Sequence, residues 1–218
     1  MTLMMMEMQI TSQQERIHNM SRFEINKNIK YYNDNAKEFF NSTFGADMSE
    51  TIDRFLKYLN EGDRILDFGC GSGRDSKTFI EKGLSVVAMD GSEKLCKLAR
   101  TILGPAVLHM KFKEIMWEND FDGVWACASL LHVPKQQMDE IVNKLYKSLK
   151  DNGVLYCSFK LGTDERETNE RSFSDYDMQS LLSLLQSHDF EVLELFITGD
   201  VRSDRKNEKW INAIARKG

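Results

Sequence analysis

The stretch Arg64–Arg74, which reads RILDFGCGSGR, is the most informative part of this 218-residue chain. Its apolar residues Ile65, Leu66 and Phe68 predict a short buried strand, and glycines follow at positions 69, 71 and 73. Glycine allows positive φ and lets a ligand come close to the backbone. The D-x-G-x-G-x-G spacing fits neither the G-x-G-x-x-G fingerprint of dinucleotide-binding turns nor a Walker loop, which needs G-K-[ST]. We therefore expect this turn to bind a small polar metabolite.

Helical and strand patterns alternate along the chain. Two segments at helical spacing, around 32–40 and 48–59, precede the first strand. After the glycine turn we expect helices over 74–82, 92–103, 135–149 and 174–188, and strands over 85–89, 106–110, 121–127, 154–159, 191–197 and 210–216. Gly153 is interpreted as a helix stop, and Ser174 with Asp177 as an S-x-x-D helix start. The alternation predicts an α/β fold with a Rossmann-like, doubly wound, seven-stranded and mostly parallel sheet.

The last two predicted strands are joined by the loop 198–209, which is short for a helical crossover. They should therefore form an antiparallel hairpin at the C-terminus. We see no internal repeat and no low-complexity linker, and the length allows one good core. The simplest organisation is a single domain over 26–218, preceded by a mobile or loosely helical arm over 1–25.

Charge and composition point to a small partner in a reducing compartment. The net charge of −5, from 29 basic and 34 acidic residues, gives no broad basic surface for a nucleic-acid backbone. No stretch approaches the roughly 18 apolar residues of a membrane span, and the methionine-rich N-terminus does not resemble a secretory signal. The four cysteines show no C-x-x-C spacing, so we expect neither a metal site nor a disulfide framework. A cytoplasmic protein without a membrane partner fits these features.

The glycine turn resembles the first motif of the class I S-adenosylmethionine-dependent methyltransferases. The resemblance covers almost everything from Tyr31 to Arg216, and it implies the seven-stranded fold with S-adenosylmethionine as cofactor. Within the class, GCGSGRDSKTFIEKGLSVVAMDGS is similar to small cytoplasmic enzymes of the tellurite-resistance type. This narrower likeness rests mainly on the cofactor half, which many substrates share, so it assigns no acceptor.

The resemblance assigns cofactor contacts residue by residue. It implies that Asp67 organises the methionine end of the cofactor, often through water, and that Asp90 accepts hydrogen bonds from the ribose hydroxyls. Asp90 could alternatively cap the following helix. Arg74 could reach the cofactor carboxylate and Asp75 could cap exposed amides, or both could lie on an ordinary surface. The expected cofactor-binding set is Tyr31, Asp67, Gly69, Cys70, Gly71, Arg74, Asp75, Asp90, Gly91, Ser92, Phe112, Ala128 and Ser129.

The residues expected to face the acceptor follow the fourth, fifth and sixth strands or precede the sheet. His132, in SLLHVP, is the candidate general base, with packing of its loop as the alternative. Tyr31 and Tyr32 are expected to begin a lid helix within 31–60. One of the two would contact the cofactor or the acceptor, and the other would pack against the fold. Tyr31 is also a candidate catalytic group. Four cations could together hold a carboxylate or phosphate, or form a solvated mixed-charge surface: Lys160, Arg171, Arg202 and Arg205.

The predicted reaction is methyl transfer to an oxygen, nitrogen or sulfur of a small molecule. The segment ACASLLHVP contains no [DNS]-P-P-[YFW] and no Pro-Cys pair, which disfavours two classes of nucleic-acid base methyltransferase. An RNA methyltransferase needing neither motif and a non-catalytic cofactor-binding regulator stay open as alternatives.

Overall fold

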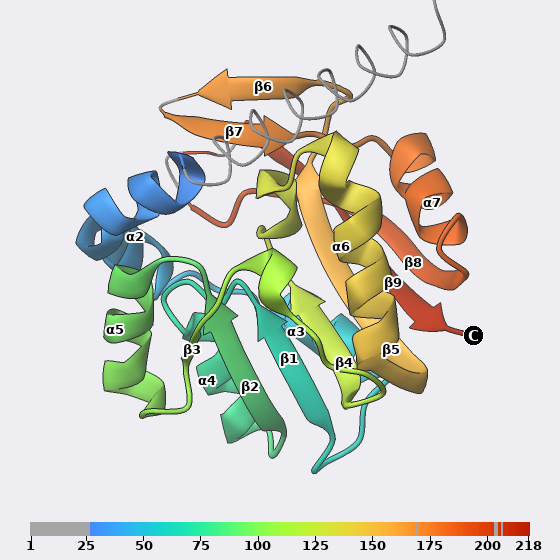
Figure 1. The fold of residues 1–218 in the computed structure, drawn as a ribbon, viewed down its shortest axis with the longest axis horizontal. Coiled ribbons are helices and arrows are strands. Elements are labelled where there is room, and N and C mark those ends of the chain that lie inside the picture. The colour runs from blue at the N-terminus through green and yellow to red at the C-terminus, as the bar shows by residue number, and fades with distance from the viewer. Residues whose placement is uncertain (1–26, 169, 203–204, 206) are drawn as a thin grey trace, which may run out of the picture.

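The computed structural model describes residues 27–168, 170–202, 205 and 207–218 (Figure 1). The predicted arm over 1–25 lies outside the described residues, and the single domain over 26–218 stays a prediction. Among the described helices, none is both long and apolar enough to cross a bilayer.

A seven-stranded sheet forms the centre of the fold and confirms the predicted class. Its strands are β1 (Arg64–Phe68), β2 (Ser85–Asp90), β3 (Leu108–His109), β4 (Phe121–Ala126), β5 (Leu149–Lys160), β8 (Phe190–Gly199) and β9 (Lys209–Lys217). The order is β3-β2-β1-β4-β5-β9-β8, and β1 to β5 pair in parallel. β9 is antiparallel to both β5 and β8, so the predicted terminal hairpin is also confirmed. The carboxyl ends of β1, β2, β4 and β5 therefore meet at one edge.

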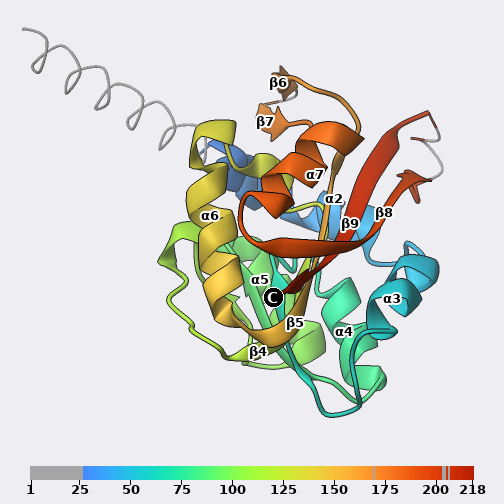
Figure 2. The same cartoon turned by 90° about the vertical axis from the view of Figure 1, so that its right-hand side faces the viewer.

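Helices cover both faces of this sheet (Figure 2). On one face, α3 (Ser49–Leu56) and α4 (Arg74–Glu81) place Phe55 and Phe79 against Trp125 of β4. On the other, α6 (Lys135–Ser148) and α7 (Met178–Gln186) pack apolar side chains such as Leu145 and Leu181 into a second cluster. α5 (Glu93–Leu103) lies beside β2, where Cys96 and Ala99 are fully buried. The alternation of inward side chains along each strand thus produces two apolar layers.

Between β5 and α7 the chain forms a hairpin that the sequence analysis did not predict. Strands β6 (Glu165–Thr168) and β7 (Arg171–Ser174) pair antiparallel and lie beyond the carboxyl ends of the main sheet (Figure 1). The predicted S-x-x-D helix start was wrong for this reason. Ser174 is a strand residue whose hydroxyl donates to the carbonyl of Val133, and Asp177 is the N-cap, accepting from the amide of Ser180.

Three element boundaries also differ from the predictions. Helix α6 ends at Ser148 and β5 begins at once, so Gly153 lies inside a strand and is not a helix stop. The predicted strand over 106–110 is reduced to two residues. The first N-terminal helix is interrupted at Asn35, giving a helical segment over 27–34 followed by α2 (Ala36–Thr43). The Asn35 side chain donates to the carbonyl of Tyr31 at this break.

Candidate active site

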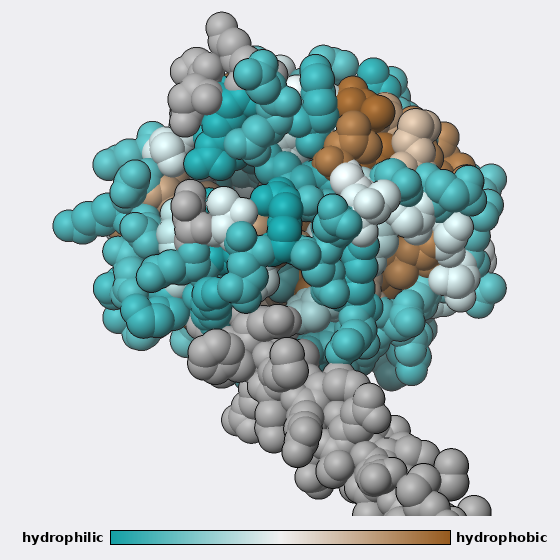
Figure 3. Space-filling view, turned by 90° about the horizontal axis from the view of Figure 1, so that it is seen from above, coloured by the Kyte–Doolittle hydropathy of each residue, from teal (hydrophilic) through white to brown (hydrophobic). Residues whose placement is uncertain are grey.

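A cavity of about 1280 Å³ opens at the carboxyl edge of the sheet, beneath the 27–34 helix and the β6–β7 hairpin. The face bearing the hairpin is mostly hydrophilic, with its hydrophobic residues gathered to one side (Figure 3). Every predicted cofactor residue except Tyr31 lines this cavity, as does every predicted acceptor residue. The members of the cofactor set in the lining are Asp67, Gly69, Cys70, Gly71, Arg74, Asp75, Asp90, Gly91, Ser92, Phe112, Ala128 and Ser129.

The glycine turn runs close against the segment that follows β4. Gly69 has φ +84°, and a Cβ there would lie 2.6 Å from the Cβ of Ser129. The amides of Gly69 and Cys70 both donate to the carbonyl of Met89, at 2.9 and 2.8 Å. These bonds tie the turn to the end of β2, so a side chain at position 69 would force the two walls of the cavity apart.

Asp90 fixes the same turn from the end of β2. One carboxylate oxygen accepts from the amide of Gly71 at 3.0 Å and the other accepts from the amide of Ser92 at 2.7 Å. The Ser92 hydroxyl caps α5 by accepting from the amide of Leu95, so Asp90 is not the cap that was weighed as an alternative. Burial raises the pKa of Asp90, and the two amide hydrogen bonds oppose that rise. Asp90 therefore holds the turn in shape while facing the cavity.

Asp67, at the end of β1, is a buried carboxyl with an altered titration. It is 3% exposed and accepts a hydrogen bond from the hydroxyl of Ser76 at 2.5 Å. Burial, followed by the charge of Asp75, raises the pKa of Asp67 to about 7, although the Ser76 hydrogen bond lowers it. Near neutral pH this group is balanced between its neutral and charged forms. A cationic ligand in the cavity would favour the charged form.

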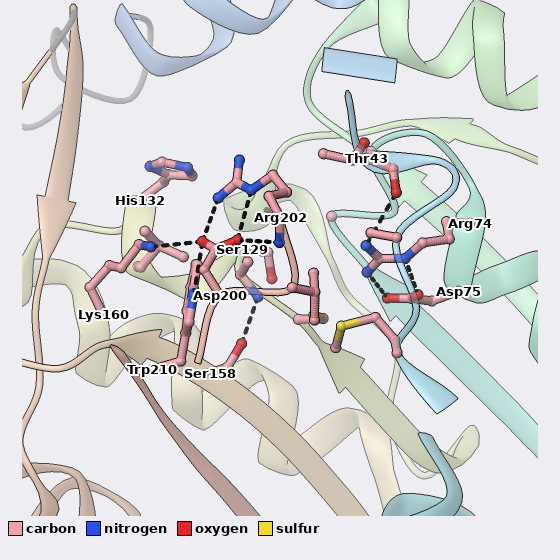
Figure 4. Close-up of a pocket in the computed structure, with 18 of the residues that line it drawn as sticks. Thr43, Arg74, Asp75, Ser129, His132, Ser158, Lys160, Asp200, Arg202 and Trp210 are labelled. Atoms are coloured by element: carbon pink, nitrogen blue, oxygen red, sulfur yellow. Dashed lines mark hydrogen bonds and ion pairs between the residues drawn. The ribbon is translucent and has the colours of Figure 1, made fainter. Parts of the chain in front are cut away.

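Arg74 and Asp75, at the start of α4, form a bidentate ion pair (Figure 4). The guanidinium donates from Nε to Oδ1 at 2.6 Å and from Nη2 to Oδ2 at 2.9 Å. Asp75 also accepts from the indole of buried Trp125 at 2.9 Å. Asp75 therefore anchors Arg74 and the core of β4, a role the helix-cap interpretation did not include. Burial alone would lower the pKa of Arg74, but the charge of Asp75 outweighs it and raises the pKa.

The segment beyond β3 and the segment beyond β4 complete the cofactor side. Phe112, in the 3-10 turn Phe112–Glu114, stacks on Phe68 with ring centroids 4.2 Å apart. Ser129 is 4% exposed, and its buried hydroxyl has no hydrogen-bond partner among the described residues. Because it lines the cavity, this hydroxyl is available to a bound molecule.

Tyr32 and His132 form a hydrogen-bonded pair on the acceptor side. The Nδ1 of His132 lies 2.9 Å from the carbonyl of Ser172, and its Nε2 lies 2.8 Å from the hydroxyl of Tyr32. A carbonyl can only accept, so Nδ1 carries the proton and Nε2 accepts from Tyr32. Burial, with a smaller effect from the charge of Arg171, lowers the pKa of His132 to about 4, although the hydrogen bond to the Ser172 carbonyl opposes this shift. Both ring nitrogens are thus engaged, one of them by Tyr32, which lines the cavity together with His132.

Tyr31 does not line the cavity. Its ring lies under the guanidinium of Arg171, with 4.4 Å between the guanidinium carbon and the ring centroid. The adjacent rings of Tyr31 and Tyr32 meet edge to face, with centroids 5.5 Å apart. Of the two tyrosines, Tyr32 therefore faces the cavity and Tyr31 packs behind it.

The four predicted acceptor cations fall into two groups. Lys160, Arg202 and Arg205 lie in a mixed-charge network around Asp200 and Glu208. Figure 4 shows the part of it formed by Lys160, Asp200 and Arg202. Asp200 accepts from Lys160 at 3.2 Å, from two nitrogens of the Arg202 side chain at 2.8 and 2.7 Å, and from the indole of Trp210 at 3.2 Å. Burial would raise the pKa of Asp200, but the Arg202 bonds and the charge of Lys160 lower it. Arg171 stands apart, on the hairpin.

Several cavity residues were missed in the sequence analysis. Arg166 of β6 forms an ion pair with Asp175, the residue after β7. The guanidinium carbons of Arg166 and Arg171 lie over the ring of Phe173, at 4.7 and 5.1 Å from its centroid. Residues 171–176 read RSFSDY, and this alternation of side chains was a signal for a strand. The preceding turn, TNER at 168–171, has no Asn-Gly pair of the kind that marks a hairpin. Asp200 was not among the candidate site residues of the sequence analysis. No group of three His, Cys, Asp or Glu side chains able to hold a metal occurs among the described residues.

Comparison with known proteins finds similarity to methyltransferases. Residues 65–153 match the family described as methyltransferase domain. The putative methyltransferase YqeM of Bacillus subtilis is 30% identical over 138 residues, which is 56% of each chain. This chain therefore spans little more than half the length of that relative.

Two solved structures share the fold over most of the chain. The 1,6-didemethyltoxoflavin-N1-methyltransferase of Burkholderia thailandensis, solved with 1,6-didemethyltoxoflavin and S-adenosylhomocysteine, gives a TM-score of 0.71 at 21% identity, covering 87% of this chain and 84% of that one. The magnesium protoporphyrin IX methyltransferase of Synechocystis PCC 6803, solved with bound S-adenosylhomocysteine, gives a TM-score of 0.68 at 19% identity. The match covers 87% of this chain and 97% of that one. At these identities the likeness establishes the fold.

Proposed function

We propose that this chain is a class I S-adenosylmethionine-dependent methyltransferase, which transfers a methyl group from S-adenosylmethionine to a nitrogen, oxygen or sulfur atom of a small molecule; the match of residues 65–153 to a methyltransferase-domain family supports this. The observation that carries the proposal is that one cavity is lined both by Asp90 with the glycine turn and by Tyr32 with His132. Its volume of about 1280 Å³ exceeds the roughly 300–1,000 Å³ of common single-ligand pockets, which leaves space for a cofactor and an acceptor together.

The residues present fit the cofactor. Gly69 has no side chain, so its backbone is accessible where a Cβ would otherwise take up the space beside Ser129. The Ser129 hydroxyl next to it has no hydrogen-bond partner among the described residues. Asp90 keeps free lone pairs after accepting two amides, since each carboxylate oxygen can accept twice. When bound, the cofactor supplies a methyl group that is already activated on a positive sulfonium.

The chain's own residues would align the acceptor and exclude water. Tyr32 presents its oxygen to the cavity, and His132 holds the Tyr32 hydroxyl through Nε2. An acceptor that arrives as an alcohol or ammonium must lose a proton. That proton would pass to the Tyr32 oxygen as the Tyr32 hydroxyl proton moves to His132 Nε2, so Tyr32 touches the acceptor and His132 acts through it.

The small-molecule acceptor is supported by the net charge of −5 and by the ligand that the Burkholderia thailandensis enzyme binds. The narrower likeness to tellurite-resistance methyltransferases and a cytoplasmic location stay predictions. The acceptor atom is left open among nitrogen, oxygen and sulfur.

Two experiments test the proposal. Calorimetry of the full chain should show binding of S-adenosylhomocysteine and none of NAD; the reverse pattern contradicts the cofactor assignment. A screen with methyl-labelled cofactor should then transfer label to a component of a metabolite extract. Label only in total RNA would indicate an RNA methyltransferase, and cofactor binding without any transfer would favour a regulator.

A further inference from the structure

Arg171 is a buried cation at the acceptor end of the cavity. It opens strand β7 and is only 7% exposed. Among the described cations that line the cavity, only Arg171 and Lys160 are more than nine-tenths buried. Lys160 lies beside two carboxylates, Asp200 and Glu208. Arg171 forms no ion pair with any carboxylate in the part of the chain that the structure describes.

The contacts around Arg171 offset only part of the free-energy cost of burying its charge. Its guanidinium carbon lies 4.4, 5.9 and 5.1 Å from the ring centroids of Tyr31, Tyr32 and Phe173. The attraction between a cation and aromatic faces is weaker than the free-energy cost of burying an unpaired charge. Its one hydrogen bond within the described residues runs from Nη1 to the Tyr32 hydroxyl at 3.5 Å.

The remaining donors of Arg171 are available to a ligand. A guanidinium carries five N–H donors in a planar fork, and the buried Nε of Arg171 has no partner among the described residues. The neighbouring cavity arginines differ in this respect. Arg74 is held by Asp75, Arg166 by Asp175 and Arg202 by Asp200.

The charge balance selects the kind of anion. Arg171 offers one unneutralised buried positive charge, which matches a carboxylate monoanion in bidentate geometry. A phosphate ester carries nearly two negative charges at neutral pH and would need a second free cation. The other buried cation in the described lining of the cavity, Lys160, already faces Asp200 and Glu208.

We propose that Arg171 binds a carboxylate of the methyl acceptor and so directs the accepting atom toward Tyr32. This proposal rests on the methyltransferase function proposed above and assigns its substrate class. The acceptor is a small carboxylic acid, and Arg171 rather than the Lys160–Arg202–Arg205 group selects it.

The test compares benzoate, its neutral isostere benzamide and phenyl phosphate by ligand-observed NMR, on the full chain with and without saturating S-adenosylhomocysteine. Benzoate should bind about tenfold more tightly than benzamide, the effect of one charge-assisted contact. Arg171→Gln should remove this preference. Arg202→Gln, the matched control, should keep it, because Asp200 retains Lys160 and Trp210 as partners.

Arg171→Lys provides a second variant if Arg171→Gln unfolds. It keeps the positive charge over Tyr31 but loses the bidentate fork, so part of the benzoate preference should be lost. The proposal is overturned if the parent does not prefer benzoate, if both Arg171 variants keep the full preference, or if phenyl phosphate binds tenfold more tightly than benzoate. Failure of S-adenosylhomocysteine to bind, with the benzoate preference intact, would count against the methyltransferase function alone.

Discussion

Asp90 illustrates how one side chain can serve the fold and the candidate site together. The sequence analysis weighed ribose binding against helix capping for this residue. The structure shows two backbone contacts instead of a helix cap, because its carboxylate accepts the amides of Gly71 and Ser92. A change at Asp90 should therefore alter both cofactor affinity and the order of the glycine turn.

We predict that Asp90→Ala weakens S-adenosylhomocysteine binding by about 1–3 kcal/mol, the scale of losing hydrogen bonds to a charged group. Calorimetry measures the affinity. Asp122→Ala is the control, since Asp122 also accepts a backbone amide, from Arg64 at 2.9 Å, but does not line the cavity. Unchanged affinity in Asp90→Ala, or an equal loss in Asp122→Ala, would remove Asp90 from the cofactor site.

Asp67 should couple cofactor binding to proton release. Its pKa of about 7 leaves about half of the molecules protonated at pH 7. The positively charged groups of S-adenosylmethionine would favour the carboxylate and lower that pKa on binding. We therefore expect about half a proton to be released per molecule bound at pH 7, and almost none at pH 9.

Calorimetry in buffers of different ionisation enthalpy measures this release. Asp67→Asn should abolish it. In Ser76→Ala the proton release should persist to higher pH. In the parent protein the Ser76 hydroxyl lowers the pKa of Asp67, so its removal should raise that pKa. A binding heat at pH 7 that does not depend on the buffer would contradict the predicted link.

At the scale of elements, the strands and helices with strong periodicity were predictable, and the connections were not. β1, β2 and β4 were expected within a residue or two of their observed bounds because apolar side chains fill both faces of a central parallel strand. Gly153 was misread because a glycine signals a helix end and a strand irregularity equally well. Here it follows Asn152 at φ 64°, where the register of β5 against β4 shifts.

The acceptor side was harder to predict because it depends on tertiary contacts. The β6–β7 hairpin carries Arg171 into the cavity, yet its strands are four residues long and only weakly patterned. Ion pairs across long separations, such as Lys160 with Asp200, have no local signature. The cofactor side follows from strand ends and glycine spacing, so all of its predicted residues but Tyr31 reached the cavity.

The glycine turn between β1 and α4 gives a prediction at this scale. Gly69→Ala places a Cβ 2.6 Å from Ser129 Cβ, whereas Gly62→Ala has almost the same φ, +86° against +84°, and meets nothing within 4 Å. Both carry the strain of positive φ, so their difference isolates the clash. We expect Gly69→Ala to lose about 1–3 kcal/mol more stability than Gly62→Ala, the typical cost of overpacking.

Urea unfolding and calorimetry of both glycine variants check this expectation. S-adenosylhomocysteine affinity should fall at least about tenfold in Gly69→Ala, since a shift of 1.4 kcal/mol is tenfold. It should be unchanged in Gly62→Ala. Equal behaviour of the two variants would mean that the close approach at Gly69 is not required.

At the scale of the whole molecule, two buried groups of the site, Asp67 and His132, make the free energy of unfolding depend on pH in opposite directions. The folded pKa of Asp67, about 7, lies above its ordinary 3.8, so its contribution is full below pH 3.8 and lost as pH rises through 7. The folded pKa of His132, about 4, lies below its ordinary 6.5. Its contribution is full above pH 6.5 and lost as pH falls toward 4.

A His132→Gln variant separates the two contributions, because Asp67 is present in both proteins and cancels in their difference. Protonating His132 in the folded state would oppose burial and the charge of Arg171, and its Nε2 could no longer accept from Tyr32. We expect the free energy of unfolding of the parent to fall relative to the variant between pH 6.5 and 4. The loss should be at most about 3 kcal/mol, from about 1.4 kcal/mol per pKa unit.

Urea unfolding at pH 7, 5.5 and 4.5 measures this difference, with His109→Gln as the control for removing an exposed imidazole. The His109 variant should follow the parent at each pH. If the parent and His132→Gln curves stay parallel from pH 7 to 4.5, His132 is not held neutral by the fold. The Tyr32–His132 pair would then lose its fixed proton arrangement, and with it the proton path proposed for the acceptor.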